Sequence, residues 1–119
     1  MTRQHGMTAS KLKNKNHKIY MRNYNFFIYI TTNPTRTVLY VGVTKDLYAR
    51  MEQHAEDNLN KKKTFAGKYF CYNLIYWERF QYIQDAIARE KEIKGWRREK
   101  KIELIATFND TWDFLNDTL

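Results

Sequence analysis

The stretch of sequence that decides the fold is FFIYITTNPTRTVLYVGV, residues 26–43. Residues 26–32 and 38–43 are rich in β-branched and aromatic side chains, which are typical of strands. Between them, residues 33–36 read NPTR and supply turn residues. Pro34 has no N–H to donate, so it is harmless in a turn but would cost a hydrogen bond inside either strand. The stretch therefore predicts a β-hairpin.

The chain after the hairpin predicts a helix, a further strand and two more helices. Asp46 can cap a helix that runs to about Asp57 and buries Leu47 and Met51. The later segments are a strand at 69–80, helices from Tyr82 to about Gly95 and from Arg97 to Phe108, and a short amphipathic piece at 111–119. The order β-β-α-β-α-α predicts an α/β (α+β) domain with a small mixed three-stranded sheet flanked by helices.

The charge is concentrated near the N-terminal end. The 119 residues hold 21 Lys and Arg against 13 Asp and Glu, a net charge of +8. Residues 1–24 contain six basic and no acidic residues, and they lack an apolar period. We therefore expect a flexible basic arm at 1–23 and one folded domain at 24–119.

A second basic run, formed by Lys61, Lys62, Lys63 and Lys68, lies in a polar segment between the predicted helix and strand. Clustered lysines favour a polyanion such as nucleic acid. The alternative interpretation is that these lysines are solvated and only keep the protein soluble. Composition alone leaves both open.

Several classes of protein are excluded. The longest apolar run, FFIYI at 26–30, is too short for a membrane span, and residues 1–20 have no apolar core typical of a secretory signal. Cys71 is the single cysteine, which excludes an internal disulfide and a zinc site with several cysteines. A cytoplasmic location is the simplest expectation.

One carboxylate falls within an apolar helical stripe. Ile83, Ala86, Ile87 and Ile93 predict the buried face of the second helix, and Glu90 lies on the same face, seven residues after Ile83. A carboxylate there needs a counter-charge or a bound cation. The alternative is that Glu90 lies at the edge of the stripe and pairs with Lys94 or Arg97.

The first helix and the hairpin carry further candidates. Leu47, Arg50 and His54 share one helix face, where a guanidinium could bind phosphate through two hydrogen bonds. His54 could act as a base, as a phosphate donor or as a structural residue. Tyr29 and Tyr40 lie within the predicted strands, and taken alone they are packing residues with solvated hydroxyls.

The candidates fall in a recognisable order. FIY at 27–29 is followed by YVG at 40–42, TKDLYAR at 44–50 with His54, and AIAREKEIK at 86–94. This ordered set resembles the GIY-YIG nuclease superfamily, in particular its small single-domain bacterial members, which are relatives of the N-terminal nuclease domain of the excinuclease ABC complex. The resemblance covers about residues 24–105.

The resemblance implies hydrolysis of DNA phosphodiester bonds, in repair or recombination. The catalytic residues it implies are Tyr29, Tyr40, Arg50, His54 and Glu90, and Glu90 would hold one Mg²⁺ or Mn²⁺ ion. The substrate-binding residues expected are Gly42, Lys45, Lys61, Lys62, Lys63 and Lys68. Arg50 would clamp the phosphate, and one of the two tyrosines would orient or deprotonate the attacking water.

Two of these roles carry physical conditions. A tyrosine pKa is ordinarily about 10, so Arg50 or the cation has to lower it if a tyrosine is the base. Gly42 is expected where the backbone approaches a phosphate or a helix closely, because glycine has no Cβ.

The sequence departs from the family pattern at three positions. Phe27 replaces the first glycine, Val41 replaces isoleucine, and Val43 stands where excision-repair members have lysine. No second domain for target recognition is evident, so we expect a protein partner to supply specificity. Two alternatives stay open: a catalytically weak or inactive nucleic-acid-binding module of the same fold, and an accessory protein that docks through its acidic C-terminal piece.

Overall fold

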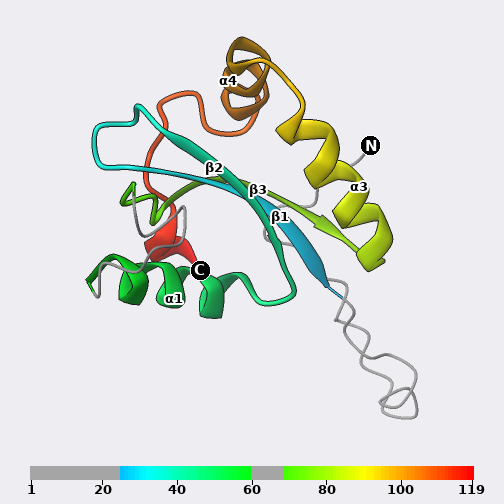
Figure 1. The fold of residues 1–119 in the computed structure, drawn as a ribbon, viewed down its shortest axis with the longest axis horizontal. Helices are drawn as coiled ribbons and strands as arrows, with labels where there is room; N and C mark the ends of the chain where they lie inside the picture. Colours follow the sequence, from blue (N-terminus) through cyan, green and yellow to red (C-terminus); the bar gives the residue numbers. More distant parts are fainter. Residues whose placement is uncertain (1–24, 60–68) are drawn as a thin grey trace.

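The computed structural model describes residues 25–59 and 69–119 (Figure 1). The predicted basic arm at 1–23 and the lysines at 61–63 and 68 lie outside the described residues. The elements, labelled as in Figure 1, are β1 (Phe26–Thr32), β2 (Leu39–Thr44), α1 (Leu47–Leu59), β3 (Asn73–Phe80), α3 (Ile83–Lys94), α4 (Arg98–Ala106) and the short 3-10 helix η3 (Asn116–Thr118). The predicted order β-β-α-β-α-α is confirmed.

The sheet has the strand order β2-β1-β3, with β1 in the centre. Both pairings are antiparallel, and Tyr29 of β1 lies opposite Gly42 of β2 and Trp77 of β3. The α/β fold class is confirmed, but the expected mixed sheet is wrong. The connection through α1 carries the chain across to the free side of β1, so β3 runs parallel to β2 without pairing with it.

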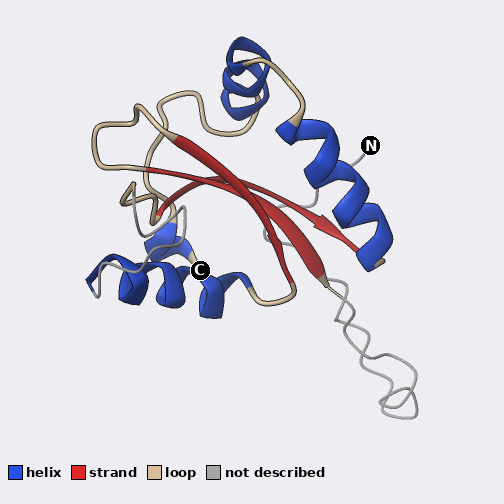
Figure 2. Cartoon of the chain, in the orientation of Figure 1, coloured by secondary structure: helices blue, strands red, loops and turns tan. Residues whose placement is uncertain are grey.

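Helices cover both faces of the sheet (Figure 2). On one face, Ile28 and Ile30 of β1 pack with Ala86 and Ile93 of α3 and with Ile105 of α4. On the opposite face, the helix α1 buries an apolar pair against the sheet. The cluster on that face consists of Tyr29, Leu47, Met51 and Leu74. The alternation of side chains along β1 therefore sends Tyr29 towards α1 and its neighbours Ile28 and Ile30 towards α3.

Local signals predict some element ends well. The backbone N–H of Ala49 donates to Asp46 Oδ1 at 3.0 Å, which confirms Asp46 as the cap of α1. The strand β3 begins at Asn73 rather than at residue 69. Phe70 has a φ of 59°, and this left-handed backbone interrupts an extended strand.

The buried stripe of α3 is narrower than expected. Ala86 and Ile93 are fully buried, whereas Ile83 and Ile87 are 40% and 37% exposed. The sheet therefore holds α3 through one small and one large apolar side chain. Among the helices of residues 25–59 and 69–119, none has the length and apolarity needed to cross a membrane.

The C-terminal piece closes the outer edge of β3. The backbone N–H of Leu74 donates to Asn116 Oδ1 at 2.8 Å, and the N–H of Leu115 donates to the Leu74 carbonyl at 2.7 Å. Asn116 Nδ2 also donates to the Tyr72 carbonyl at 2.9 Å. These bonds occupy backbone groups that an edge strand would otherwise present to another chain.

Replacing Asn116→Ala should lower the free energy of unfolding by about 1–2 kcal/mol, because two hydrogen bonds to the edge of β3 are lost. Urea unfolding followed by circular dichroism measures the change. The matched control is Asp117→Ala, since Asp117 is the exposed neighbour. An equal loss in both variants would contradict the role given to Asn116.

Candidate active site

Tyr29 lies at the centre of the site, in the middle of β1. Its side chain is 1% exposed, and its hydroxyl is hydrogen-bonded to His54 Nε2 at 3.0 Å. His54 comes from the buried face of α1, below Leu47 and Met51. The helix face predicted from the spacing of Leu47 and His54 therefore turns inward, and it delivers an imidazole to the Tyr29 phenol.

Tyr40 completes a cluster of three rings, which we call the tyrosine–histidine cluster (Tyr29, Tyr40 and His54). The Tyr40 ring centroid lies 6.2 Å from that of Tyr29 and 5.6 Å from that of His54. Tyr29 and His54 are 5.7 Å apart by the same measure. Tyr29 is buried whereas Tyr40 is only partly buried, so the two tyrosines present different hydroxyls to solvent.

Gly42 makes room for the Tyr29 ring. A Cβ at Gly42 would lie 2.5 Å from the Tyr29 hydroxyl oxygen and 2.6 Å from Cζ, far inside van der Waals contact. The close approach expected at this glycine is thus made by a tyrosine of the neighbouring strand rather than by a helix. Contact of Gly42 with substrate stays a prediction.

Arg50 follows the cluster along α1. Its Nη1 donates to Gln53 Oε1 at 3.2 Å. Among the residues that the structure describes, no carboxylate forms an ion pair with Arg50. Its guanidinium therefore keeps a full positive charge and several donors for an anion.

Glu90 lies on α3 with its side chain 15% exposed, at the edge of the buried stripe. Its Oε2 forms an ion pair with Lys94 Nζ at 2.9 Å. The alternative that Glu90 lies at the edge and pairs with Lys94 is therefore confirmed. Arg97 instead pairs with Glu99 at 3.7 Å, one turn into α4.

The pKa of Tyr29 links these residues electrostatically. Burial is the main cause that raises the pKa of Tyr29 above its ordinary value, and the neighbouring Tyr40 and the charge of Glu90 raise it further. The charge of Arg50 acts in the opposite direction. Arg50 and Glu90 thus lie within electrostatic reach of one phenol. The expected lowering of a tyrosine pKa is wrong for Tyr29, because loss of hydration outweighs Arg50.

The donor set suits a hard divalent cation bound largely through substrate. Within residues 25–59 and 69–119, no three His, Cys, Asp or Glu side chains gather into a closed metal site. Glu90 supplies one carboxylate whose ion-pair partner, Lys94, is half-exposed and can move aside. Mg²⁺ commonly uses one or two carboxylates together with waters and substrate phosphate. Glu90 therefore fits such an ion.

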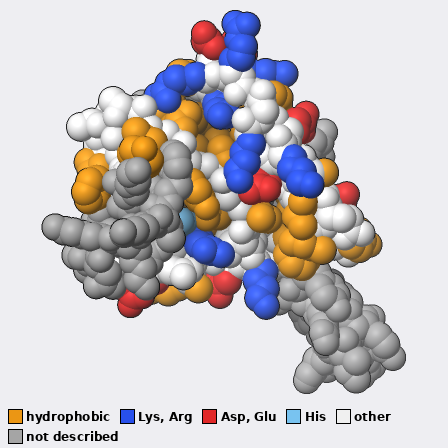
Figure 3. Space-filling model, in the orientation of Figure 1, with side chains coloured by type: hydrophobic (Ala, Val, Ile, Leu, Met, Phe, Trp, Pro, Cys, Tyr) orange, Lys and Arg blue, Asp and Glu red, His pale blue; other side chains and the backbone are white. Residues whose placement is uncertain are grey.

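The remaining predicted residues differ in what the structure says of them. Lys45 is exposed in the turn between β2 and α1, on the side of the sheet that carries Arg50. The lysines Lys61, Lys62, Lys63 and Lys68 fall outside the described residues. On the face seen in Figure 3, Lys and Arg side chains extend from α4 along α3 with acidic side chains between them, so this face is not uniformly basic.

Sequence reasoning missed a buried ionic group beside α3. Glu78 of β3 is 0% exposed and receives hydrogen bonds from Arg89 of α3 and from the Tyr76 hydroxyl. The signal was available, because Tyr76, Glu78 and Phe80 alternate along a strand whose inward face should be apolar. A carboxylate at such a position demands a partner.

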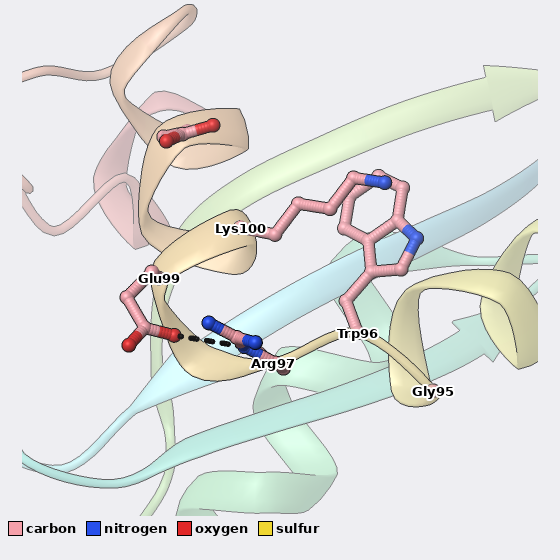
Figure 4. A pocket seen from close by; sticks show the side chains of 6 residues that line it. Gly95, Trp96, Arg97, Glu99 and Lys100 are labelled. Carbon is pink, nitrogen blue, oxygen red and sulfur yellow. Dashed lines mark ion pairs between the residues drawn. The ribbon is translucent and has the colours of Figure 1, made fainter.

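A hollow of about 460 Å³ lies at the corner between α3 and α4. Figure 4 shows Lys100 lying along the ring of Trp96, 4.4 Å from its centroid, and Arg97 paired with Glu99. None of the predicted site residues lines this hollow. It is separate from the tyrosine–histidine cluster.

Comparison with known proteins identifies the class to which this fold and site belong. Residues 25–103, which span the whole sheet together with α1 and α3, match the GIY-YIG catalytic domain. Since this match covers more than half of the chain, the protein belongs to the GIY-YIG family, and the resemblance drawn from the motifs is confirmed.

The similar proteins are small members of this family. The UPF0213 proteins of Staphylococcus aureus strains Mu3 and Mu50 are each 36% identical to this chain over 67 residues, which is 56% of this chain and 78% of the relative. The solution NMR structure of a UPF0213 protein from Bacillus halodurans is 25% identical, with a TM-score of 0.46, and the match covers 71% of this chain and 86% of that chain.

Replacing Gly42→Ala should lower the free energy of unfolding by about 1–3 kcal/mol, because the new methyl group displaces the buried Tyr29 ring. Chemical denaturation measures the loss. Gly95→Ala is the matched control, since a Cβ there meets only the Glu92 and Lys91 carbonyls at 3.6 Å. If both variants lose stability equally, the contact between Gly42 and Tyr29 does not have this role.

The raised pKa of Tyr29 predicts a dependence of stability on alkaline pH. The folded protein holds the phenol proton more tightly than the unfolded chain, whose tyrosine pKa is about 10. The resulting stabilisation is complete below that pH and is lost as the pH rises through it towards the folded pKa. In Tyr29→Phe, the free energy of unfolding should therefore fall less steeply above pH ~10 than in wild type.

Urea unfolding at a series of alkaline pH values measures these slopes. The exposed Tyr82→Phe serves as the control and should keep the wild-type slope. A Tyr29→Phe variant that declines as steeply as wild type would count against the buried, protonated phenol.

Proposed function

We propose that the protein is a divalent-metal-dependent endonuclease that hydrolyses DNA phosphodiester bonds. The observation that carries this proposal is the convergence of Arg50 and Glu90, from helices on opposite faces of the sheet, on the electrostatic surroundings of Tyr29. A cation that binds phosphate and a carboxylate that binds metal, close to paired hydroxyls, are suited to phosphoryl chemistry.

Arg50 binds the scissile phosphate in this proposal. Its guanidinium has no carboxylate partner among the described residues, so it can donate to two phosphate oxygens. Because its charge is fixed, the interaction strengthens as negative charge builds up in the transition state. Gln53, which accepts from Nη1, helps to orient the side chain.

The two tyrosines have different roles. The buried Tyr29 has a raised pKa and therefore keeps its proton, so it acts as a hydrogen-bonding group held by His54. Tyr40 is only partly buried, and its hydroxyl is the one that orients the attacking water. His54 keeps the Tyr29 phenol fixed, so that Tyr40 packs against a rigid ring.

Glu90 holds the cation, which would neutralise charge on the phosphate and stabilise the leaving oxygen. For Glu90 to bind it, Lys94 has to release the carboxylate. This ion pair joins residues four apart on an exposed helix surface, where such pairs contribute little stability. Lys94 is then free to contact the phosphate backbone of the substrate.

The substrate is DNA, held without sequence preference by basic residues around the site. Lys45, together with Lys61, Lys62, Lys63, Lys68 and the arm at 1–23, would supply phosphate contacts. A protein partner would supply target specificity, and the role would lie in DNA repair or recombination. A cytoplasmic location agrees with the single cysteine, Cys71, whose burial raises the pKa of its thiol to about 11 and keeps it unreactive.

One observation favours the alternative of a nucleic-acid-binding module that cleaves weakly. Glu90 is occupied by Lys94, and Tyr29 is held protonated, so both groups are in a resting arrangement. If DNA binding does not release Glu90, the domain binds DNA without efficient cleavage. The same experiment separates the two functions.

Supercoiled plasmid incubated with Mg²⁺ should be nicked by the wild-type protein, and EDTA should stop the reaction. Arg50→Ala should reduce the rate by about 100-fold, because phosphate charge is no longer stabilised. Glu90→Gln should abolish nicking by removing the metal ligand, and both variants should still bind DNA.

Glu99→Gln is the control for loss of a carboxylate, since Glu99 is exposed on α4 and pairs with Arg97. It should nick as wild type does. Equal nicking by wild type and Glu90→Gln would overturn the enzyme. Binding without nicking by every protein would favour the binding module.

A further inference from the structure

The buried carboxylate of Glu78 is fully used by its neighbours. Arg89 Nε donates to Oε1 and Nη2 donates to Oε2, both at 3.0 Å, and the Tyr76 hydroxyl donates to Oε2. Glu78 belongs to β3 and Arg89 to α3, so the pair joins a helix to an edge strand of the sheet. Two parallel hydrogen bonds fix the direction of the guanidinium as well as its distance.

Arg89 is held from two further sides. Its Nη1 donates to Glu92 Oε1 at 2.9 Å, and its guanidinium carbon lies 5.2 Å from the centroid of the Trp96 ring. Burial alone would lower the pKa of Arg89, but the hydrogen bonds with Glu78 and Glu92 raise it overall, so the charge is permanent. The side chain is therefore a rigid charged strut between β3 and α3.

Few other contacts set the rotation of α3 about its axis. Its buried residues are only Ala86 and Ile93, and the side chain of Tyr82 at the N-cap makes no capping hydrogen bond. Apolar packing of one methyl group and one isoleucine is not directional. The bidentate pair of Glu78 and Arg89 supplies the direction that this packing lacks.

Glu90 follows Arg89 immediately in the sequence. Consecutive residues of a helix point about 100° apart, so when Arg89 is directed at β3, Glu90 is directed to the side of the helix from which it acts on Tyr29. A carboxylate lies roughly 5 Å from the helix axis, and a helix rotation of about 20° would move it by about 2 Å. A displacement of about 1 Å can lower a catalytic rate by 100-fold.

We propose that Glu78 and Arg89 form a positioning pair that sets the orientation of Glu90 for metal binding. This inference rests on the proposed function, since it assigns the metal to Glu90. Neither Glu78 nor Arg89 contacts the substrate. Their effect reaches the site through the rotation of α3, and it therefore alters metal affinity and turnover more than DNA binding.

The test measures binding of Mn²⁺ to the full-length, DNA-free protein by electron paramagnetic resonance. Arg89→Lys keeps the charge but loses the bidentate geometry, and it should weaken Mn²⁺ binding by about 10-fold. The double variant Glu78→Gln/Arg89→Gln leaves no unpaired buried charge, so it keeps the test valid if Arg89→Lys fails to fold. In nicking assays, both should lower kcat and leave KM for plasmid DNA unchanged.

Two controls separate the possible failures. Glu92→Gln removes the exposed partner of Arg89 and leaves the bonds to Glu78, so it should bind Mn²⁺ as wild type does. Glu90→Gln should lose the bound Mn²⁺. If Glu90→Gln loses it while the folded Arg89→Lys and double variants keep wild-type affinity and kcat, the positioning pair is purely structural and the inference is overturned. If wild type and Glu90→Gln bind Mn²⁺ equally, or neither does, the proposed function fails and the inference fails with it.

Discussion

The contact between the Tyr29 phenol and the backbone of Gly42 is the constraint on which the site depends. It lets a large side chain lie flat across the neighbouring strand, where any other residue at position 42 would place a Cβ within the ring. Only in this position does the hydroxyl reach His54 on α1, and only then do Tyr40 and His54 pack against the ring. The pairing of β1 with β2, the orientation of α1 and the arrangement of three functional side chains therefore share one steric requirement.

The protein reaches its two opposite charges by different routes. Arg50 lies on α1, on the same face as the Tyr29 ring, and it needs no ionic support from the described residues. Glu90 belongs to α3, which packs on the other face, and it acts near Tyr29 from the far side of the sheet. The helix that carries the carboxylate is the one held by a buried ion pair. The more distant group thus has the stiffer support, which is expected when a small rotation is amplified at the tip of a side chain.

Local chemistry was readable from the sequence, and distant pairing was not. The turn around Pro34 and the cap at Asp46 depend on neighbouring residues, so the hairpin and the start of α1 followed from short patterns. The family motifs predicted Tyr29 and Glu90 as members of one site, because their order carries information that composition does not. The buried pair of Glu78 with Arg89 and the fully antiparallel sheet depend on which segments meet, and no short pattern encodes that.

The closure of β3 by the segment around Asn116 has a consequence for synthesis of the protein. All three strands and α3 precede this segment in the sequence, so the sheet can assemble on the ribosome before its outer edge is covered. Until Leu115 and Asn116 emerge, the backbone of Leu74 is available to any extended chain nearby, including another copy. Translation speed over the last part of the message, and chaperone binding during it, therefore govern how much protein escapes self-association.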